Sequence, residues 1–364
     1  MSCGFVHEAC EVGSYGVFLG ISNTDYSSIR PSDSAYSATG APISIAAGRL
    51  AFFHDMHGPC VTIDTACASS LTALHVAASS VHSGDCSGAL VCAACLCLTP
   101  TVSMSYGRAG MLSPTGRCHV FDQRADGFAR GEGVGALLLG SARLHVLLGS
   151  SVRHDGRSAS LTSPNGTEQR LLLRSVWVKT SVESMVICQA HGSGTALGDA
   201  TELWALQQCH GVCQPRIVAV GGTKANTGHL EPAAGLIGLA GLMTELACAQ
   251  SWPNARLRVS SEHMVTPFEA SLSTQLVQLA REDGAPSIGV AGVSSFGFSG
   301  TITHTALRVV PATSATLHEL RAAPRFRMRA FPWKHRTATS RCMYCACWDE
   351  VSAAAAVQHA HASL

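Results

Sequence analysis

One cysteine, Cys67, stands where the chain changes from a strand-like to a helix-like pattern. The apolar-rich run 60–63 precedes it, and the run 69–80 after it places Leu71, Leu74 and Ala78 on one helical face. A cysteine at such a turn lies near the positive end of a helix dipole, which favours the nucleophilic thiolate. Cysteines more often serve as small buried apolar side chains, so this residue alone leaves both interpretations open.

Two histidines lie in glycine-rich surroundings further along the chain. His191 follows a short apolar run, and His229 precedes a long run of small and apolar residues. Flanking glycines let backbone and ligand approach closely, but the chain has 17 histidines, so two in loops mean little by themselves. The loop 294–301 contains Phe298 between glycines and is typical of a mobile aromatic gate with a backbone N–H available as an oxyanion donor.

Composition excludes several classes of protein. The chain has 364 residues, of which 46% are hydrophobic and 13% charged, as expected of an enzyme with a large core and not of a disordered chain. The net charge is +1 and no dense stripe of Lys and Arg occurs in residues 1–310, which gives nucleic-acid binding little support. No uninterrupted apolar run reaches the roughly 18 residues of a membrane span.

The chain has 16 cysteines, which could form disulfides, bind metal or stay reduced. Cys92, Cys95 and Cys97 lie in a uniformly apolar run typical of a buried strand, which favours core thiols. A further group, Cys342, Cys345 and Cys347, has no second pair at zinc-finger spacing, so we predict no metal site. Because residues 1–8 lack the pattern of a signal peptide, we expect a reducing, cytoplasmic location, with organelle targeting left open.

Strand-like and helix-like runs alternate up to about residue 310, which predicts an α/β fold. The predicted strands are 17–21, 60–63, 89–98, 134–139, 186–189, 217–220, 288–293 and 301–310, and the predicted helices are 44–53, 69–80, 167–178, 200–208 and 233–247. The composition changes after residue 310. We therefore expect one domain over 1–310, followed by a linker or poorly ordered tail over 311–364 in which 352–357 could form a short helix.

Several motifs together resemble the β-ketoacyl synthase (ketosynthase) family, and most closely the ketosynthase domains of type I polyketide synthases. Besides the Cys67, His191, His229 and Phe298 motifs, the resemblance rests on GVFLGIS (16–22), DTACASSL (64–71), AGMLSP (109–114), FD (121–122) with ADGFARGEG (125–133), and SPNG (163–166). Their common order makes chance similarity very improbable.

The resemblance implies a role for each matching residue. Cys67 would take an acyl group from a carrier thioester, and His191 and His229 would serve the decarboxylation of a malonyl-type thioester, whose enolate then attacks the acyl group. The N–H groups of Cys67 and Phe298 would form an oxyanion hole. In addition, Lys224 would orient the His191 side of the site, Ser193 and Thr195 would bind the phosphopantetheine arm, and Glu132 would join the network near the lysine or form a simple structural ion pair. No cofactor would be bound by the chain itself, because both substrates are carried on the phosphopantetheine of an acyl carrier protein.

The resemblance also implies a thiolase-like fold with α-β-α-β-α layers and a homodimer formed across an edge strand, which would be 89–98. The family elements that come before the segment at Val17 are missing here, so we expect an N-terminally incomplete domain whose first sheet lacks a central strand. Between Leu139 and Arg157 the chain is shorter than the family pattern, and Ile302 replaces a family asparagine beside the gate.

The sequence leaves three hypotheses about function. The first is decarboxylative condensation by an acyltransferase of polyketide or fatty-acid elongation. The second is a catalytically inactive fragment or non-catalytic partner subunit, which the missing segment and Ile302 would favour. The third is a thiolase-type acyltransferase, which needs a second cysteine in a glycine-rich motif, and no such motif is found.

Overall fold

The structure, a computed structural model, describes residues 14–22, 25–29, 36–140, 145–180, 185–213, 219–261, 271–279, 290–309, 325–328 and 348–351. The chain divides into two compact units, residues 11–310 and residues 1–10 with 311–364. The described part of the smaller unit is an antiparallel pair of strands, β13 (Arg325–Met328) and β14 (Trp348–Val351). The sequence did not predict this pair, and the predicted helix 352–357 lies outside the described residues, as do Cys342, Cys345 and Cys347.

Two sheets organise the larger unit. The first has four strands in the order β2-β1-β3-β4: β1 (Tyr15–Ile21), β2 (Cys60–Ile63), β3 (Gly88–Cys95) and β4 (Gly133–Leu139). The second has six in the order β5-β12-β11-β6-β7-β9: β5 (His145–His154), β6 (Met185–Gln189), β7 (Ala219–Gly221), β9 (Ser271–Leu272), β11 (Val290–Phe296) and β12 (Thr301–Val309). A small antiparallel pair, β8 (Gln250–Ser251) and β10 (Val277–Gln278), forms a separate two-stranded sheet.

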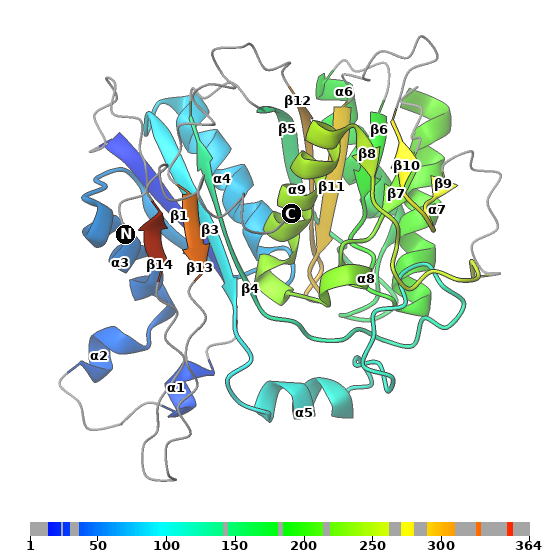
Figure 1. The fold of residues 1–364 in the computed structure, drawn as a ribbon, viewed down its shortest axis with the longest axis horizontal. Coiled ribbons are helices and arrows are strands. Elements are labelled where there is room, and N and C mark those ends of the chain that lie inside the picture. The colour runs from blue at the N-terminus through cyan, green and yellow to red at the C-terminus, as the bar shows by residue number, and fades with distance from the viewer. Residues whose placement is uncertain are drawn as a thin grey trace, which may run out of the picture. The chain divides into compact units, whose positions relative to one another are not determined.

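Helices form three layers around these sheets (Figure 1). The central layer is α4 (Ser69–Ser83) and α9 (Ala234–Cys248), which pack on each other and on both sheets, while α3 (Ile43–His54) covers the outer face of the first sheet. The outer face of the second sheet is covered by α6 (Gly166–Thr180), against which α7 (Ala196–Cys213) packs. Short helices α1 (Tyr26–Ile29), α2 (Ser37–Gly40), α5 (Thr101–Arg108), α8 (Lys224–Thr227) and a 3₁₀ turn (Glu231–Ala233) complete the described elements. The succession of layers is the predicted thiolase-like arrangement.

The central helices are apolar enough to be buried between two sheets. Leu71 and Leu74 of α4 and Leu239 and Leu242 of α9 are almost fully buried in one core cluster that also includes strand residues of both sheets. A helix that is covered on two sides needs apolar or small residues nearly all round. Among the described residues, no helix is long and apolar enough to cross a membrane.

The position of β3 differs from the prediction. The strand ends at Cys95 instead of residue 98, because the chain turns away and the Cys97 N–H donates to Glu132 Oε1 at 2.7 Å. It is also no edge strand, since it pairs with β1 on one side and β4 on the other. The expected gap in the first sheet is likewise absent from the described residues, where β1 pairs with β2 and β3.

Candidate active site

Cys67 lies on the tight turn between β2 and α4. Ala66 before it has a left-handed φ of 53°, and its N–H donates to Asp64 Oδ1 at 3.0 Å. The hydroxyl of Ser69 donates to the Ala66 carbonyl at 2.6 Å, so side chains on both sides fix the turn. The hydroxyl of Ser295 on β11 donates to the Cys67 carbonyl at 2.6 Å, which ties the nucleophile turn to the second sheet.

Close packing of backbone also holds the first turn of α4. A Cβ on Gly20 of β1 would lie 2.7 Å from the Ser70 nitrogen, and a Cβ on Gly235 of α9 would lie 2.6 Å from Leu71 Cγ. Both distances are shorter than real contacts allow. The first sheet and the neighbouring central helix therefore approach this turn as closely as they do only because both positions are glycine.

The Cys67 thiol is protonated at neutral pH. Burial raises its pKa to about 12, although Lys224 opposes the shift. The backbone N–H groups of Phe298 and of Cys67 itself also hydrogen-bond the sulfur and lower the pKa. Desolvation therefore outweighs these favourable contacts in the free site, and the predicted effect of the helix dipole on the thiolate stays a prediction. The same two N–H groups are those that the sequence predicted for an oxyanion hole.

His191 follows β6 and is held from two sides. Its Nδ1 accepts a hydrogen bond from the Phe296 N–H at 3.1 Å, and its own backbone N–H donates to Glu202 Oε1 at 2.8 Å. The Lys224 ammonium donates to the His191 carbonyl oxygen. Burial, with Lys224 and His229 nearby, lowers the pKa of His191 well below its usual value. The neutral ring therefore carries its proton on Nε2.

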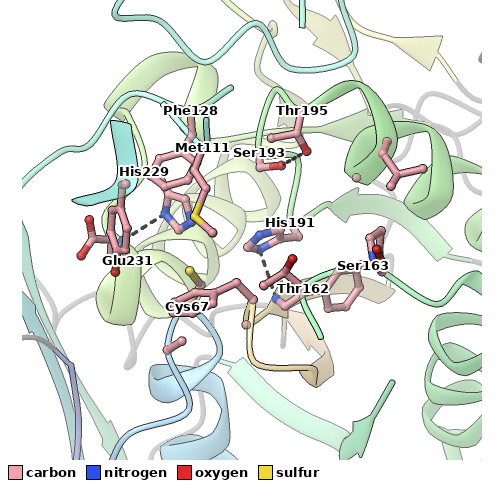
Figure 2. A pocket seen from close by; sticks show the side chains of 18 of the residues that line it. Cys67, Met111, Phe128, Thr162, Ser163, His191, Ser193, Thr195, His229 and Glu231 are labelled. Carbon is pink, nitrogen blue, oxygen red and sulfur yellow. Dashed lines mark hydrogen bonds between the residues drawn. The ribbon is translucent and has the colours of Figure 1, made fainter. Parts of the chain in front are cut away.

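His229 has the same tautomer for a similar reason. Its Nδ1 accepts the Glu231 N–H at 3.0 Å, and burial, with Lys224 and Arg130, lowers its pKa well below the usual value. The ring centroids of the two histidines are 5.6 Å apart, and the Phe128 ring packs 4.8 Å from His229. Figure 2 shows His191, His229 and the Cys67 sulfur around one space. Two N–H donors and one thiol therefore face the same cavity.

These side chains line a cavity of about 420 Å³. Its other lining residues include Tyr106, Met111, Asp155, Thr162, Ser163, Gln169, Ser193, Thr195, Leu197 and Phe298. The hydroxyls of Ser193 and Thr195 hydrogen-bond each other at 2.8 Å on the far side of His191 from Cys67 (Figure 2). Phe298 is 44% exposed at the gate, so this ring stands between the cavity and solvent.

Lys224 is buried, and burial lowers its pKa although neighbouring acidic groups oppose the shift. Those groups include Glu202 and Asp199 of α7, whose pKa values burial raises to about 7 and about 6. The structure places Glu132 elsewhere: it is exposed and accepts the Cys97 N–H. The predicted role of Glu132 stays a prediction. The sequence did not point to Asp199 and Glu202, because their spacing on one helix gave no sign that α7 runs beneath the His191 loop.

Sequence reasoning also missed a buried ion pair beside His229. Arg130 Nε and Nη2 donate to the two carboxylate oxygens of Glu231, and both side chains are about 95% buried. Arg130 Nη1 also donates to Ser103 Oγ on α5 at 2.8 Å, and its guanidinium lies 5.6 Å from the centre of the Tyr106 ring. The pair therefore links the loop that orients His229 to the helix that covers the cavity. Among the described residues, no group of acidic, His and Cys side chains could hold a metal ion.

Comparison with known proteins agrees with this site. Residues 3–145 match the model of the N-terminal domain of β-ketoacyl synthases, and residues 144–257 match that of the C-terminal domain. The chain is 38% identical over 334 residues to polyketide synthase ThaG of Burkholderia thailandensis, an alignment that covers 82% of this chain and 6% of that protein. It is also 37% identical over 319 residues to polyketide synthase GfsE of Streptomyces halstedii, covering 82% and 8%. The chain thus spans a small part of these relatives.

Solved structures show the same relationship. The ketosynthase from module 6 of the bacillaene synthase of Bacillus subtilis superposes with a TM-score of 0.73 at 32% identity, covering 82% of this chain and 55% of that one. An oxazolomycin ketosynthase domain from Streptomyces albus gives 0.75 at 28% identity, covering 82% and 56%. From its two domain matches, its relatives and its layered fold, the chain belongs to the β-ketoacyl synthase family of condensing enzymes, in the type I polyketide synthase branch.

Proposed function

We propose that this chain catalyses decarboxylative condensation between an acyl group on Cys67 and a malonyl-type thioester. The observation that carries the proposal is the meeting of one thiol with two neutral imidazole N–H donors in one cavity. The thiol suits the first step of that reaction and the two imidazoles suit the second. Neither imidazole would suit hydrolysis as a general base, because both Nδ1 atoms already accept hydrogen bonds.

In the first step, the Cys67 sulfur attacks the carbonyl carbon of an acyl thioester. The oxyanion of the tetrahedral intermediate receives hydrogen bonds from the N–H groups of Cys67 and Phe298, which already point at the sulfur. The bond between the carbonyl carbon and the carrier sulfur then breaks. The proton that Cys67 loses ends on the departing carrier thiol, so the exchange is neutral overall.

In the second step, the malonyl-type thioester loses carbon dioxide from its carboxylate. The electron pair of the broken carbon–carbon bond forms an enolate, whose oxygen accepts hydrogen bonds from Nε2–H of His191 and His229. The enolate carbon attacks the acyl carbonyl, the bond to Cys67 sulfur breaks, and the released thiolate takes a proton from water. Neutral imidazoles are suited to this step because they stabilise the enolate without protonating its carbon.

The substrates reach the cavity on a carrier. We infer that Ser193 and Thr195 bind a phosphopantetheine arm, because their hydroxyls lie in the cavity wall beyond His191. The partner is then an acyl carrier protein, and no resident cofactor enters the reaction. Lys224 has a positioning role, since it binds the His191 carbonyl and its charge acts on Cys67 and on both histidines.

The inactive-fragment alternative has no support in the described residues. Ile302, the departure that favoured it, is fully buried in β12 and replaces a polar side chain with an apolar one in the core. The thiolase-type alternative needs a second thiol at the site, and Cys67 is the one cysteine among the described residues that line the cavity.

The test is the intact mass of the protein after incubation with an acyl-pantetheine thioester. The wild-type chain should gain one acyl group and Cys67→Ala none. Separately, Cys67→Ala should still release carbon dioxide from a malonyl-pantetheine thioester, whereas Cys67→Ala with His229→Ala should lose most of that activity, because one enolate donor is gone. A folded wild-type sample that gains no acyl group would refute the proposal.

A further inference from the structure

The polar groups of the cavity fall into three sets, of which one has no role in the proposed reaction. Cys67 and the two histidines perform the chemistry, and the hydroxyls of Ser193 and Thr195 are assigned to the carrier arm. The third set is Gln169, the fourth residue of α6, and Asp155, the residue that follows β5.

Gln169 is 1% exposed, and its Oε1 atom has no hydrogen-bond partner among the described residues. A buried amide oxygen without a partner has lost its hydrogen bonds to water and gained none in the protein, which is unfavourable. The side chain lines the cavity, so a ligand in the cavity could supply the missing donor. Gln169 is therefore a candidate binding group whose oxygen would accept a hydrogen bond from a substrate in the cavity.

Asp155 offers a second acceptor in the same wall. It is 7% exposed, and its Oδ1 accepts a long hydrogen bond of 3.3 Å from the Asn165 N–H. Its backbone is fixed, because its N–H donates to the Gly300 carbonyl at 2.8 Å and its carbonyl accepts from Asn165 Nδ2 at 2.9 Å. The carboxylate is thus held rigidly beside the gate loop. Two acceptors in one wall call for a ligand with N–H or O–H donors.

The location of Gln169 favours the carrier arm over the acyl chain as the source of these donors. The first turn of α6 packs on α7: a Cβ on Gly166 would lie 2.8 Å from the Trp204 ring. The predicted arm residue Thr195 directly precedes α7, and Leu197 in its first turn lines the cavity while 61% exposed. An exposed residue of the cavity wall, Leu197, thus lies at the start of the helix against which α6, the helix of Gln169, packs.

We propose that Gln169 and Asp155 form an acceptor subsite that binds an N–H or O–H group of the pantetheine arm. The inference rests on the proposed function for the identity of the arm. The acceptor subsite adds a second set of binding groups for the arm. Its two oxygens accept hydrogen bonds, whereas the hydroxyls of Ser193 and Thr195 can also donate them. Arms that lack amide and hydroxyl donors should gain nothing from this subsite.

The first experiment compares two donors of the same acyl group. Wild type, Gln169→Leu and a control variant Glu168→Gln are acylated with hexanoyl-pantetheine and with the hexanoyl thioester of propanethiol, which has no arm donor. Gln169→Leu should acylate roughly threefold to tenfold more slowly with the pantetheine thioester, the effect of one lost hydrogen bond, and at the wild-type rate with the propanethiol thioester. Glu168, a neighbour that does not line the cavity and pairs with Arg153, should leave both rates unchanged when replaced.

If Gln169→Leu lowers the acylation rate equally with both thioesters, or lowers it with neither, the proposal is overturned. If Gln169→Leu discriminates instead between hexanoyl and 3-hydroxyhexanoyl propanethiol thioesters, the subsite belongs to the acyl chain and the arm assignment is wrong. Gln169→Asn, which keeps an amide on a shorter side chain, gives a second variant should the leucine variant fold poorly, and its loss should fall in the same direction.

A binding measurement separates this inference from the proposed reaction. S-ethyl pantetheine, a thioether that cannot acylate the protein, is titrated calorimetrically into wild type and Gln169→Leu. Weaker binding to the variant supports the subsite even if wild type never becomes acylated, in which case the proposed function alone fails. The same affinity for both proteins, or no binding to wild type, refutes the subsite.

Discussion

Burial acts on the thiol and on the imidazoles through the same physical effect, the cost of placing a charge away from water. For Cys67 it raises the pKa to about 12, and for His191 and His229 it lowers the pKa well below the usual value. All three groups are therefore neutral near pH 7. The free site combines a protonated nucleophile with two hydrogen-bond donors, and the charge needed for chemistry develops only during the reaction.

The first prediction concerns the reactivity of the thiol. Because the pKa of Cys67 is about 12, its alkylation by iodoacetamide should become about tenfold faster for each pH unit between 7 and 9, without levelling off. Peptide mass spectrometry measures the rate at Cys67, with Cys67→Ala as the blank. A plateau near pH 8 would show a much lower pKa and contradict the prediction.

The second prediction concerns the imidazoles. Their lowered pKa values mean that the neutral, Nε2-protonated form persists as the pH falls from 8 to 6. Decarboxylation of malonyl-pantetheine by Cys67→Ala should therefore show no loss of rate over this interval. Released carbon dioxide is the readout. A fall with an inflection near 6.5, the usual pKa of histidine, would mean that one of these rings is protonated in that range.

At the level of elements, the loop that contains His229 is fastened by the Arg130–Glu231 ion pair. The bridge from Arg130 to Ser103 and Tyr106 extends the attachment to α5, and the Tyr106 ring in turn packs 6.2 Å from the ring of the gate residue Phe298. The Arg130–Glu231 pair is thus connected to His229 directly and to the gate residue Phe298 through the Tyr106 ring.

The third prediction follows from the burial of both partners. Arg130→Met should lower the free energy of unfolding by about 3 kcal/mol, because Glu231 would be left as an uncompensated buried charge. Arg130→Met combined with Glu231→Leu should recover much of that loss. Urea denaturation measures all three chains. If the double variant is as unstable as the single one, the loss comes from packing and not from the unpaired charge.

Sequence patterns predicted the elements whose apolar pattern is strong locally. They failed for elements whose formation depends on pairing with a distant strand. The strand 60–63 matches β2, and the helix 69–80 matches most of α4, because their apolar patterns lie in the sequence itself. The ten-residue strand β5 was missed, since its residues are half-buried without alternation and are organised by pairing with β12.

The candidate site shows the same division. Cys67, His191, His229 and Lys224 were found from their motifs, and the structure brings them together. The acids beneath the His191 loop and the Arg130–Glu231 pair were not found, because carboxylates on a helix are ordinarily solvated. Only the packing of α7 and of the 231–233 turn shows that Glu202 and Glu231 are buried. Their roles in catalysis stay predictions.

For the molecule as a whole, the family homodimer remains a prediction, but the strand at its interface cannot be β3, as the sequence analysis expected. Among the described strands of the first sheet, β2 and β4 stand at the edges and β3 is interior. The short edge strand β2 carries Cys60 and Val61, both exposed, and the helix that packs on it has Phe52 and Phe53, which are 92% and 68% exposed. We therefore expect two copies to associate along β2.

The fourth prediction tests this edge. Val61→Lys should convert a dimer to a monomer, because a charged side chain at an edge strand opposes pairing with a second chain. Leu138→Lys on β4, at a position 45% exposed, is the matched control and should leave the dimer intact. Sedimentation velocity reads both. Dissociation by Leu138→Lys alone would place the interface at β4, and a wild-type monomer at micromolar concentration would refute the dimer.

The two glycines packed against the first turn of α4 have a consequence for the protein's evolution. Gly20 and Gly235 are far apart in the sequence and touch no substrate, yet any larger residue at either would push the nucleophile turn aside. In a saturation library selected for acylation of Cys67, both positions should therefore be as restricted as the nucleophile itself. Gly40 and Gly48, where an added Cβ would meet nothing within 4 Å, should accept substitution freely. The substitutions that evolution can tolerate at this site are then limited as much by close backbone packing as by the needs of the reaction.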